Sequence, residues 1–195
     1  MTLYDGSAER LMERNPGKGL SPPWLEKILK DMLIALMFLA HKGIIHRDIK
    51  PANILYTQDP SKKIVEFVLA DFGLSREQLQ AKTLGAGTPL YMAPEMKIQG
   101  AEQCHKVDVY SLGVTILVLG NASGIASNKC PSNFQEVQAA LESALQDRGF
   151  EFVARMLCQD PMKRPSTQEL YLARWPNESG AREMTPMLTG QRMDG

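Results

Sequence analysis

The sequence predicts a mainly α-helical fold with a small β-hairpin region, and three observations lead to this prediction. Apolar residues follow helical spacing between Pro22 and Gly43, and a second stretch, 107–119, is apolar on almost every side. Two strand-like runs, Ile54–Tyr56 and Ile64–Ala70, lie between these stretches. Segments rich in Gly, Pro, Asn and Ser separate the elements. The chain has 195 residues, enough for one domain with a sizeable core.

The composition narrows the classes of function. The 22 acidic residues balance the 22 basic residues, so no global charge favours nucleic acid or an anionic membrane as a partner. Cys104, Cys130 and Cys158 are widely spaced and lack a CxxC pattern, which favours reduced thiols in an intracellular protein. The N-terminus lacks the apolar segment of a secretory signal, and the longest apolar runs are too short to span a bilayer. We therefore expect a soluble protein of the cytoplasm or the nucleus.

The first long helix should begin after Ser21, whose side chain can cap it, with Pro22 at its first position. Apolar residues then recur at three- and four-residue steps, as a buried helical face requires. They are Leu25, Ile28, Leu29, Met32, Leu36 and Leu39. Further apolar residues between them extend the apolar surface to most sides, so this helix should lie deep. Gly43 is placed to end it.

A charged segment follows this helix, and the stretch from 44 to 56 reads IIHRDIKPANILY. We expect a loop held between two short strands, Ile44–Ile45 and Ile54–Tyr56, because strand-like runs flank the charged centre. Pro51 fixes φ inside the loop and excludes a helix through it. The loop carries four functional side chains, those of His46, Asp48, Lys50 and Asn53.

A carboxylate, an ammonium and a carboxamide at this spacing suit the transfer of a phosphoryl group. The Asp48 carboxylate can accept a proton from a hydroxyl, and the Lys50 ammonium can neutralise phosphate charge. The amide oxygen of Asn53 can bind a hard cation. A lone His-x-Asp pattern would favour an ordinary polar surface loop, but the whole string favours phosphoryl chemistry.

The string HRDIKPAN at 46–53 resembles the catalytic loop of eukaryotic protein kinases, and four further motifs follow in the order of that family. They are DFG at 71–73, GTPLYMAPE at 87–95, DVYSLG at 108–113 and DPMKRP at 160–165. The Asp-x-Lys-Pro-x-x-Asn form resembles the serine/threonine branch, because tyrosine kinases usually lack a lysine two residues after the aspartate. The resemblance covers about residues 3–174, nearly the whole chain.

The resemblance implies that the chain binds ATP and Mg²⁺ through the loop and the strands around it. Asn53 and Asp71 would hold the magnesium ions that bridge the ATP phosphates. Lys50 would contact the γ-phosphate. Leu55 would form the floor beneath the adenine.

The resemblance also implies a protein substrate with a serine or threonine hydroxyl. Asp48 would be the base that takes the hydroxyl proton, and Thr88 would bridge Asp48 and the lysine two residues after it. Arg47 would make the site responsive to phosphorylation of the activation segment, since an arginine can pair with a phosphate. Thr83 is the preferred phosphoacceptor by position, and Ser75 is the second candidate.

Five further residues would be structural anchors by the same resemblance: His46, Phe72, Glu95, Asp108 and Arg164. Asp108 would hold the backbone of the catalytic loop, because a buried acid needs backbone donors or a cation. Glu95 and Arg164 would form a buried ion pair that clamps the activation segment to the lobe. Removing one partner of such a pair costs about 3–5 kcal/mol.

The chain divides into three expected segments. Residues 1–20 form a start that resembles the kinase hinge, with a short helix at Glu9–Arg14. Residues 21–174 form the C-terminal lobe of a kinase, and residues 175–195 form a polar, disordered tail. Within the lobe we also expect a turn at 58–61 and helices near 134–145, 150–157 and 167–174.

The N-terminal lobe of the family is expected to be absent from this chain. The 195 residues contain no G-x-G-x-x-G loop and no V-A-I-K strand, and Gly6, Gly17 and Gly19 do not fit the loop spacing. The ATP cleft would then lack its roof. Losing two contacts of about 3 kcal/mol each would slow turnover more than ten-thousandfold. Apolar surface exposed at the lost interface would favour association.

Two other functions remain alternatives. One is a catalytically inert kinase-lobe fragment or pseudokinase that serves as a binding module, which the expected absence of the N-terminal lobe favours. Retention of the loop residues argues against it. The other is a small-molecule phosphotransferase, which the GTPLYMAPE segment disfavours, because the family uses that segment to seat a peptide hydroxyl.

Overall fold

The computed structural model describes residues 4–14, 16–59, 64–71, 89–98, 100–125, 134–147 and 149–177. The helices and strands are β1 (Gly6–Ser7), α1 (Ala8–Glu13), α2 (Pro22–His41), β2 (Ile54–Asp59), β3 (Ile64–Leu69), α4 (Lys106–Leu119), α5 (Phe134–Ala144), α6 (Glu151–Ala154) and α7 (Thr167–Arg174). Four 3₁₀ turns join them, namely η1 (Pro51–Asn53), η2 (Pro89–Tyr91), η3 (Pro94–Lys97) and η4 (Ala122–Gly124). This part of the chain is mainly helical and contains the hairpin that the sequence predicts, to which the short strand β1, not predicted, adds a third strand.

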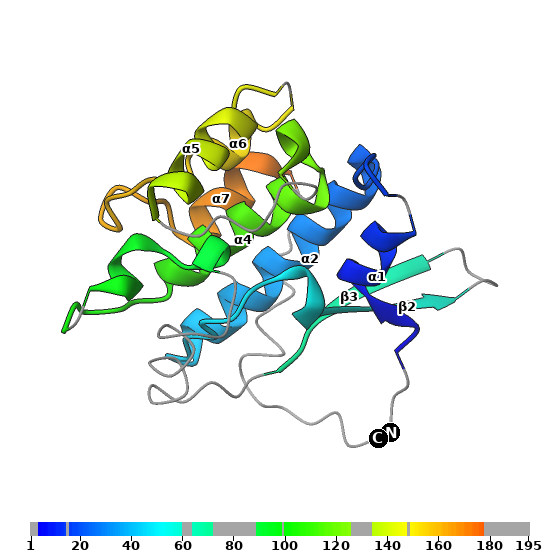
Figure 1. Cartoon of the computed structure of the whole chain (residues 1–195). Helices are drawn as coiled ribbons and strands as arrows, with labels where there is room; N and C mark the ends of the chain where they lie inside the picture. Colours follow the sequence, from blue (N-terminus) through cyan, green and yellow to red (C-terminus); the bar gives the residue numbers. More distant parts are fainter. Residues whose placement is uncertain are drawn as a thin grey trace, which may run out of the picture.

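Helix α2 runs through the middle of the molecule, between the sheet and the helices α4 and α7 (Figure 1). Its central residues Ile28, Met32 and Leu33 are fully buried, as the apolar spacing predicts. Ser21 occupies the position before the helix, but its side chain makes no capping hydrogen bond. At the other end the N–H groups of Gly43 and Ile44 donate to the last turn, which ends the helix at the predicted place.

The sheet has the order β1-β2-β3, with both pairings antiparallel. Its inner face buries Tyr56 and Phe67 against α2, and Trp24 of α2 meets Phe67 edge to face at 5.8 Å. The carboxylate of Asp31 on α2 accepts a hydrogen bond from the Phe67 N–H at 3.0 Å and pairs with Lys27 at 2.5 Å. The hairpin is therefore fixed to α2 by both apolar packing and a polar contact.

Two predictions around the catalytic-loop segment are corrected. Ile44–Ile45 forms no strand: none of the described strands pairs with this segment, and Ile44 is 45% exposed where the chain leaves the end of α2. Pro51 excludes an α-helix, as predicted, but it begins the 3₁₀ turn η1, because a missing N–H costs nothing at a first helical position.

Two boundaries also differ from the prediction. Gln58 and Asp59, which were expected in a turn at 58–61, instead pair with Val65 and Ile64 in the hairpin, and the rest of that expected turn lies outside the described residues. The helix expected near 150–157 is short: α6 covers Glu151–Ala154, and turns replace the helix after it.

Helix α4 forms the centre of the core, and every residue from Val107 to Leu119 is buried. The hydroxyl groups of Ser111 and Thr115 donate back to carbonyls one turn earlier in the helix, which satisfies these polar groups inside the core. Among the described residues, none of the helices combines the length and the apolar character that crossing a membrane requires.

The loop before α2 contacts the end of α4 very closely. The Leu20 N–H donates to the Leu119 carbonyl at 2.7 Å, and the Asn121 side chain donates to the Gly17 carbonyl at 3.0 Å. Gly19 has a φ of +66°, and a Cβ there would lie 2.4 Å from the Gly120 backbone. A side chain at this position would therefore force the two segments apart.

We expect Gly19→Ala to lower the free energy of unfolding more than Gly17→Ala does. Both glycines have a positive φ, which costs an alanine about 1–2 kcal/mol. A Cβ at Gly17 meets nothing within 4 Å, so only Gly19→Ala adds the clash, which should cost a further 1–3 kcal/mol or so. Urea unfolding of both variants measures the difference, and equal losses would contradict the close contact.

Candidate active site

The segment 46–53 is fixed to the core by one buried carboxylate. The backbone N–H groups of His46 and Arg47 donate to the two oxygens of Asp108 at 2.8 and 2.7 Å. Asp108 is 1% exposed at the start of α4. Burial raises the pKa of the Asp108 carboxyl above its usual range, and the two backbone donors partly oppose that rise. The predicted anchor is therefore present.

His46 connects the segment to the end of β3. Its Nδ1 accepts a hydrogen bond from the Asp48 N–H at 3.3 Å, so Nε2 carries the ring proton in the neutral form. Nε2 lies 3.0 Å from the Ala70 carbonyl oxygen, to which it donates. The ring is nearly buried, and its two bonds fix the backbone of Asp48 relative to the strand.

Lys50 and Asn53 converge on Asp48. The Lys50 ammonium lies 2.8 Å from the Asp48 Oδ2. The Asn53 Nδ2 donates to the Asp48 carbonyl at 2.8 Å and to Oδ2 at 3.1 Å. Among the described residues no group donates to its Oδ1, so this oxygen can serve as a ligand. The structure thus brings together the carboxylate, the ammonium and the carboxamide that the sequence predicts.

Asp71 lies two residues after the end of β3. The Ala70 N–H donates to the Asn53 carbonyl at 2.9 Å, which places the chain next to Asp71 against the turn that carries Asn53. Asp71 is exposed and has a φ of 65°, in the left-handed region that non-glycine residues seldom adopt. Such a conformation is common at functional sites.

These two residues fit a magnesium ion. Among the described residues there is no cluster of three or more His, Cys, Asp or Glu side chains that could hold a metal by itself. Mg²⁺ usually binds one or two carboxylates and completes its shell with substrate phosphates and water. The exposed carboxylate of Asp71 and the Oδ1 of Asn53 supply the hard oxygen ligands that this arrangement requires.

The outer face of the sheet is apolar near the site. Leu55 of β2 pairs with Val68 of β3, and Val68 is 38% exposed. The inner-face residues beside them are buried against α2, so alternation along the strands directs Leu55 and Val68 outward. Near the site, this face therefore presents two apolar side chains, and the role of Leu55 as an adenine floor remains a prediction.

Arg47 also has a left-handed backbone, with a φ of 69°. Its Nε donates to the Gln103 side-chain oxygen at 3.1 Å. Gln103 was not among the residues that the sequence singled out, because an isolated glutamine in a connecting segment carries no signal of its role.

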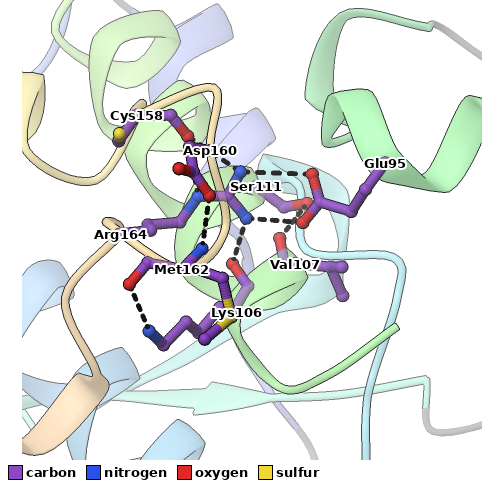
Figure 2. Close-up of polar contacts among 8 residues, drawn as sticks. All are labelled: Glu95, Lys106, Val107, Ser111, Cys158, Asp160, Met162 and Arg164. Atoms are coloured by element: carbon purple, nitrogen blue, oxygen red, sulfur yellow. Dashed lines mark hydrogen bonds and ion pairs between the residues drawn. The ribbon is translucent and has the colours of Figure 1, made fainter. Parts of the chain in front are cut away.

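The predicted ion pair between Glu95 and Arg164 is present and buried (Figure 2). The Arg164 Nη1 and Nη2 donate to the two Glu95 oxygens at 2.7 and 3.2 Å. Arg164 also donates to the Lys106 carbonyl at 2.8 Å and to the Cys158 carbonyl at 2.9 and 3.1 Å. The guanidinium is therefore satisfied on all sides and joins η3, α4 and the segment after α6.

Tyr110 extends this cluster on α4. The Arg164 guanidinium lies 5.0 Å from the centre of the Tyr110 ring, and the Tyr110 hydroxyl accepts a hydrogen bond from Gln138 on α5 at 3.1 Å. Burial raises the pKa of Tyr110. Tyr110 therefore supplies both a ring contact and a polar contact to this cluster.

Some predicted residues cannot be placed. Phe72, Ser75, Thr83 and Thr88 lie outside the residues that the structure describes. The roles assigned to them, and the seating of a peptide hydroxyl by the segment that carries them, remain predictions.

A model of the protein kinase domain family matches residues 2–176, which is most of the chain. The chain belongs to the protein kinase family. Serine/threonine-protein kinase KIC1 of Saccharomyces cerevisiae is 33% identical over 173 residues, which cover 85% of this chain and 15% of that protein. MAP kinase kinase MKK1/SSP32 of the same yeast is 42% identical over 118 residues, or 60% of this chain and 22% of that protein.

The fold agrees with a kinase domain of known structure. The crystal structure of a double mutant of the Mycobacterium tuberculosis PknI kinase domain superposes with a TM-score of 0.63 at 24% identity. The match covers 88% of this chain and 61% of that chain. This chain thus spans less than a quarter of the length of the two yeast relatives and about three fifths of the solved domain.

The sequence did not predict the roles of two residues of this kinase. Gln103, which binds the Arg47 side chain, is one, and Asp31 of α2 is the other. Asp31 had a detectable signal, since a carboxylate within a helix that is apolar on most sides needs a partner. The partner, the Phe67 backbone, could not be identified without the position of the hairpin.

We expect Glu95→Gln to destabilise the kinase by about 3–5 kcal/mol, because it leaves the buried Arg164 charge without its counter-charge. The matched control is Glu26→Gln. Glu26 forms a similar two-bond pair with Arg174, at 3.0 Å for each bond, but both side chains are at least 40% exposed. That exposed pair should contribute less than about 1 kcal/mol. Denaturant unfolding compares them, and a similar small loss in both variants would contradict the clamp.

Proposed function

We propose that residues 21–174 are the C-terminal lobe of a serine/threonine protein kinase, which transfers the γ-phosphate of ATP to a serine or threonine hydroxyl of a protein. One observation carries the proposal. The Asp48 carboxylate is held by Lys50 and Asn53 at 2.8–3.1 Å, beside the strand end that leads to Asp71. The family match and the serine/threonine kinases among the relatives support it.

Each residue has a part in this reaction. Asp48 accepts the proton of the substrate hydroxyl, and its fixed position orients that hydroxyl for attack. Lys50 donates to the transferred phosphoryl group and neutralises part of its charge. When bound, Mg²⁺ supplies charge neutralisation at the phosphates, with Asn53 and Asp71 as its protein ligands. Leu55 supports the adenine by apolar contact.

We propose further that the roof of the ATP cleft comes from outside the printed 195 residues. Family members cover the phosphates with a glycine-rich loop and a strand lysine, and neither motif occurs in this sequence. The exposed Val68 and the partly exposed Leu55 are the surface on which such a lobe would close.

The exposed, free Cys104 suits the reducing cytoplasm or nucleus, where we place the protein.

The alternative function is a kinase lobe that binds partners without catalysis. The sequence lacks the roof motifs, which favours this alternative. The ordered set of contacts around Asp48 favours catalysis, because a binding surface alone would not require Lys50 and Asn53 to converge on one carboxylate.

We expect Asp48→Asn to lower kcat about 10²–10⁴-fold, because the amide cannot accept the hydroxyl proton. The assay is peptide phosphorylation by a protein that carries this chain together with a glycine-rich loop and a strand lysine. Glu142→Gln, an exposed change on α5, is the control and should leave kcat unchanged. A protein that still phosphorylates peptide at the unchanged rate after Asp48→Asn would rule out the assigned base.

We expect Mg-ATP to raise the melting temperature of the 195-residue chain, and Asp71→Asn to abolish most of that rise. A ligand at a hundredfold excess over its Kd stabilises by about 2.7 kcal/mol. ATP with a chelator in place of Mg²⁺ is the control, because Asp71 acts only through the cation. Absence of a shift with Mg-ATP would favour the non-catalytic alternative.

A further inference from the structure

Arg47 is held at two points by residues from one distant segment. Its backbone N–H donates to Asp108, and its side-chain Nε donates to Gln103, 56 residues away in sequence. The backbone between these two bonds is left-handed. A non-glycine residue keeps such a conformation only where its surroundings fix it, so the Gln103 bond acts on a residue that is already constrained.

The chemistry of the Gln103 contact leaves the arginine able to bind an anion. A guanidinium has five N–H donors, and the contact uses only the one on Nε. Within the described residues no other hydrogen bond to the Arg47 side chain is present, so Nη1 and Nη2 keep their donors. The Asp108 carboxylate bonds the backbone of Arg47 and not its guanidinium, and the two charges also attract each other through space.

Gln103 is a neutral residue, and this affects the charge of Arg47. A carboxylate at this position would form an ion pair and cancel the positive charge of Arg47. A carboxamide oxygen fixes the Nε–H and adds no negative charge of its own. Both residues are only half-buried, so the charge can interact with a group that approaches from solvent.

We propose that Gln103 is a positioning residue, which fixes Arg47 without adding a counter-charge, so that the arginine presents Nη1 and Nη2 to a phosphoryl group. The proposal rests on the proposed function, because that phosphoryl group would regulate transfer at Asp48, the residue next to Arg47. What it adds is the residue that orients the arginine, which is a neutral side chain from the segment before α4.

Gln103→Met and Gln103→Glu separate the two parts of the proposal. Methionine has a similar shape and lacks a strong acceptor, so it removes the hold on Nε. Glutamate keeps an acceptor and adds a negative charge. Glu102→Gln, at the exposed neighbouring residue, is the matched control.

The measurement is the ¹H–¹⁵N signal of the Arg47 Nε–H group in the 195-residue chain, assigned by its disappearance in Arg47→Lys. In Gln103→Met, we expect the exchange of this proton with water to be about tenfold faster or more, because a hydrogen bond from a charged donor is lost. In Gln103→Glu the exchange should stay slow. In Glu102→Gln it should not change.

The second measurement is a titration with sodium phosphate, against sodium chloride at equal ionic strength to correct for screening. Phosphate should shift the Arg47 signal in the unmodified chain, and Gln103→Glu should weaken that binding at least about tenfold, because the arginine charge is cancelled. The titration reads binding without phosphotransfer, so its result stands even if the chain proves inactive in the Asp48 assay.

Three results would overturn the proposal. Unchanged exchange in Gln103→Met would show that Gln103 does not hold the arginine. An equal acceleration in Glu102→Gln would show that the whole segment loosens. If Gln103→Glu binds phosphate as tightly as the unmodified chain does, the neutral side chain has no role. Because this result does not depend on Gln103→Met, it tests the proposal even if Gln103→Met does not fold.

Discussion

The candidate site depends on two hydrogen bonds between a loop backbone and one carboxylate. Asp108 belongs to α4, the helix that the core surrounds on all sides, so its position is fixed by packing. By accepting from His46 and Arg47 it transfers that fixed position to the loop. Asp48 follows at the next residue, and His46 connects it to the end of β3. A buried carboxylate is expensive unless it is satisfied, and here the loop that it orients is what satisfies it.

The two buried acids within the described residues are satisfied in different ways. Glu95 is paired with a cation, Arg164, whose remaining donors bind backbone carbonyls of two other segments. Asp108 is paired with neutral backbone N–H groups and keeps a raised pKa. The first arrangement joins three segments through side-chain charge. The second orients a short stretch of backbone, which suits a residue whose neighbours must hold chemical groups in place.

Sequence and resemblance together predicted the deep helix α2, the buried α4, the Glu95–Arg164 pair and the polar residues of the segment 46–53, but not that Lys50 and Asn53 bond to Asp48. These features depend on apolar periodicity or on motifs with a fixed spacing, and both are readable in one dimension. The strand at Ile44–Ile45 was predicted wrongly, because β-branched residues favour a strand only where a partner strand lies beside them. Gln103 was missed because its role depends on where Arg47 lies, 56 residues earlier in sequence.

The hairpin has a consequence for the order in which the site assembles. The contacts that join the catalytic loop to the end of β3 are local, since His46 and Ala70 lie 24 residues apart. The Asp108 anchor and the Glu95–Arg164 clamp close much longer loops, of 62 and 69 residues. Closing a short loop costs less conformational entropy than closing a long one, so local contacts tend to form early in folding. The two candidate magnesium ligands therefore belong to the part of the chain that can form first, and the long-range contacts then fix that part onto the helical core.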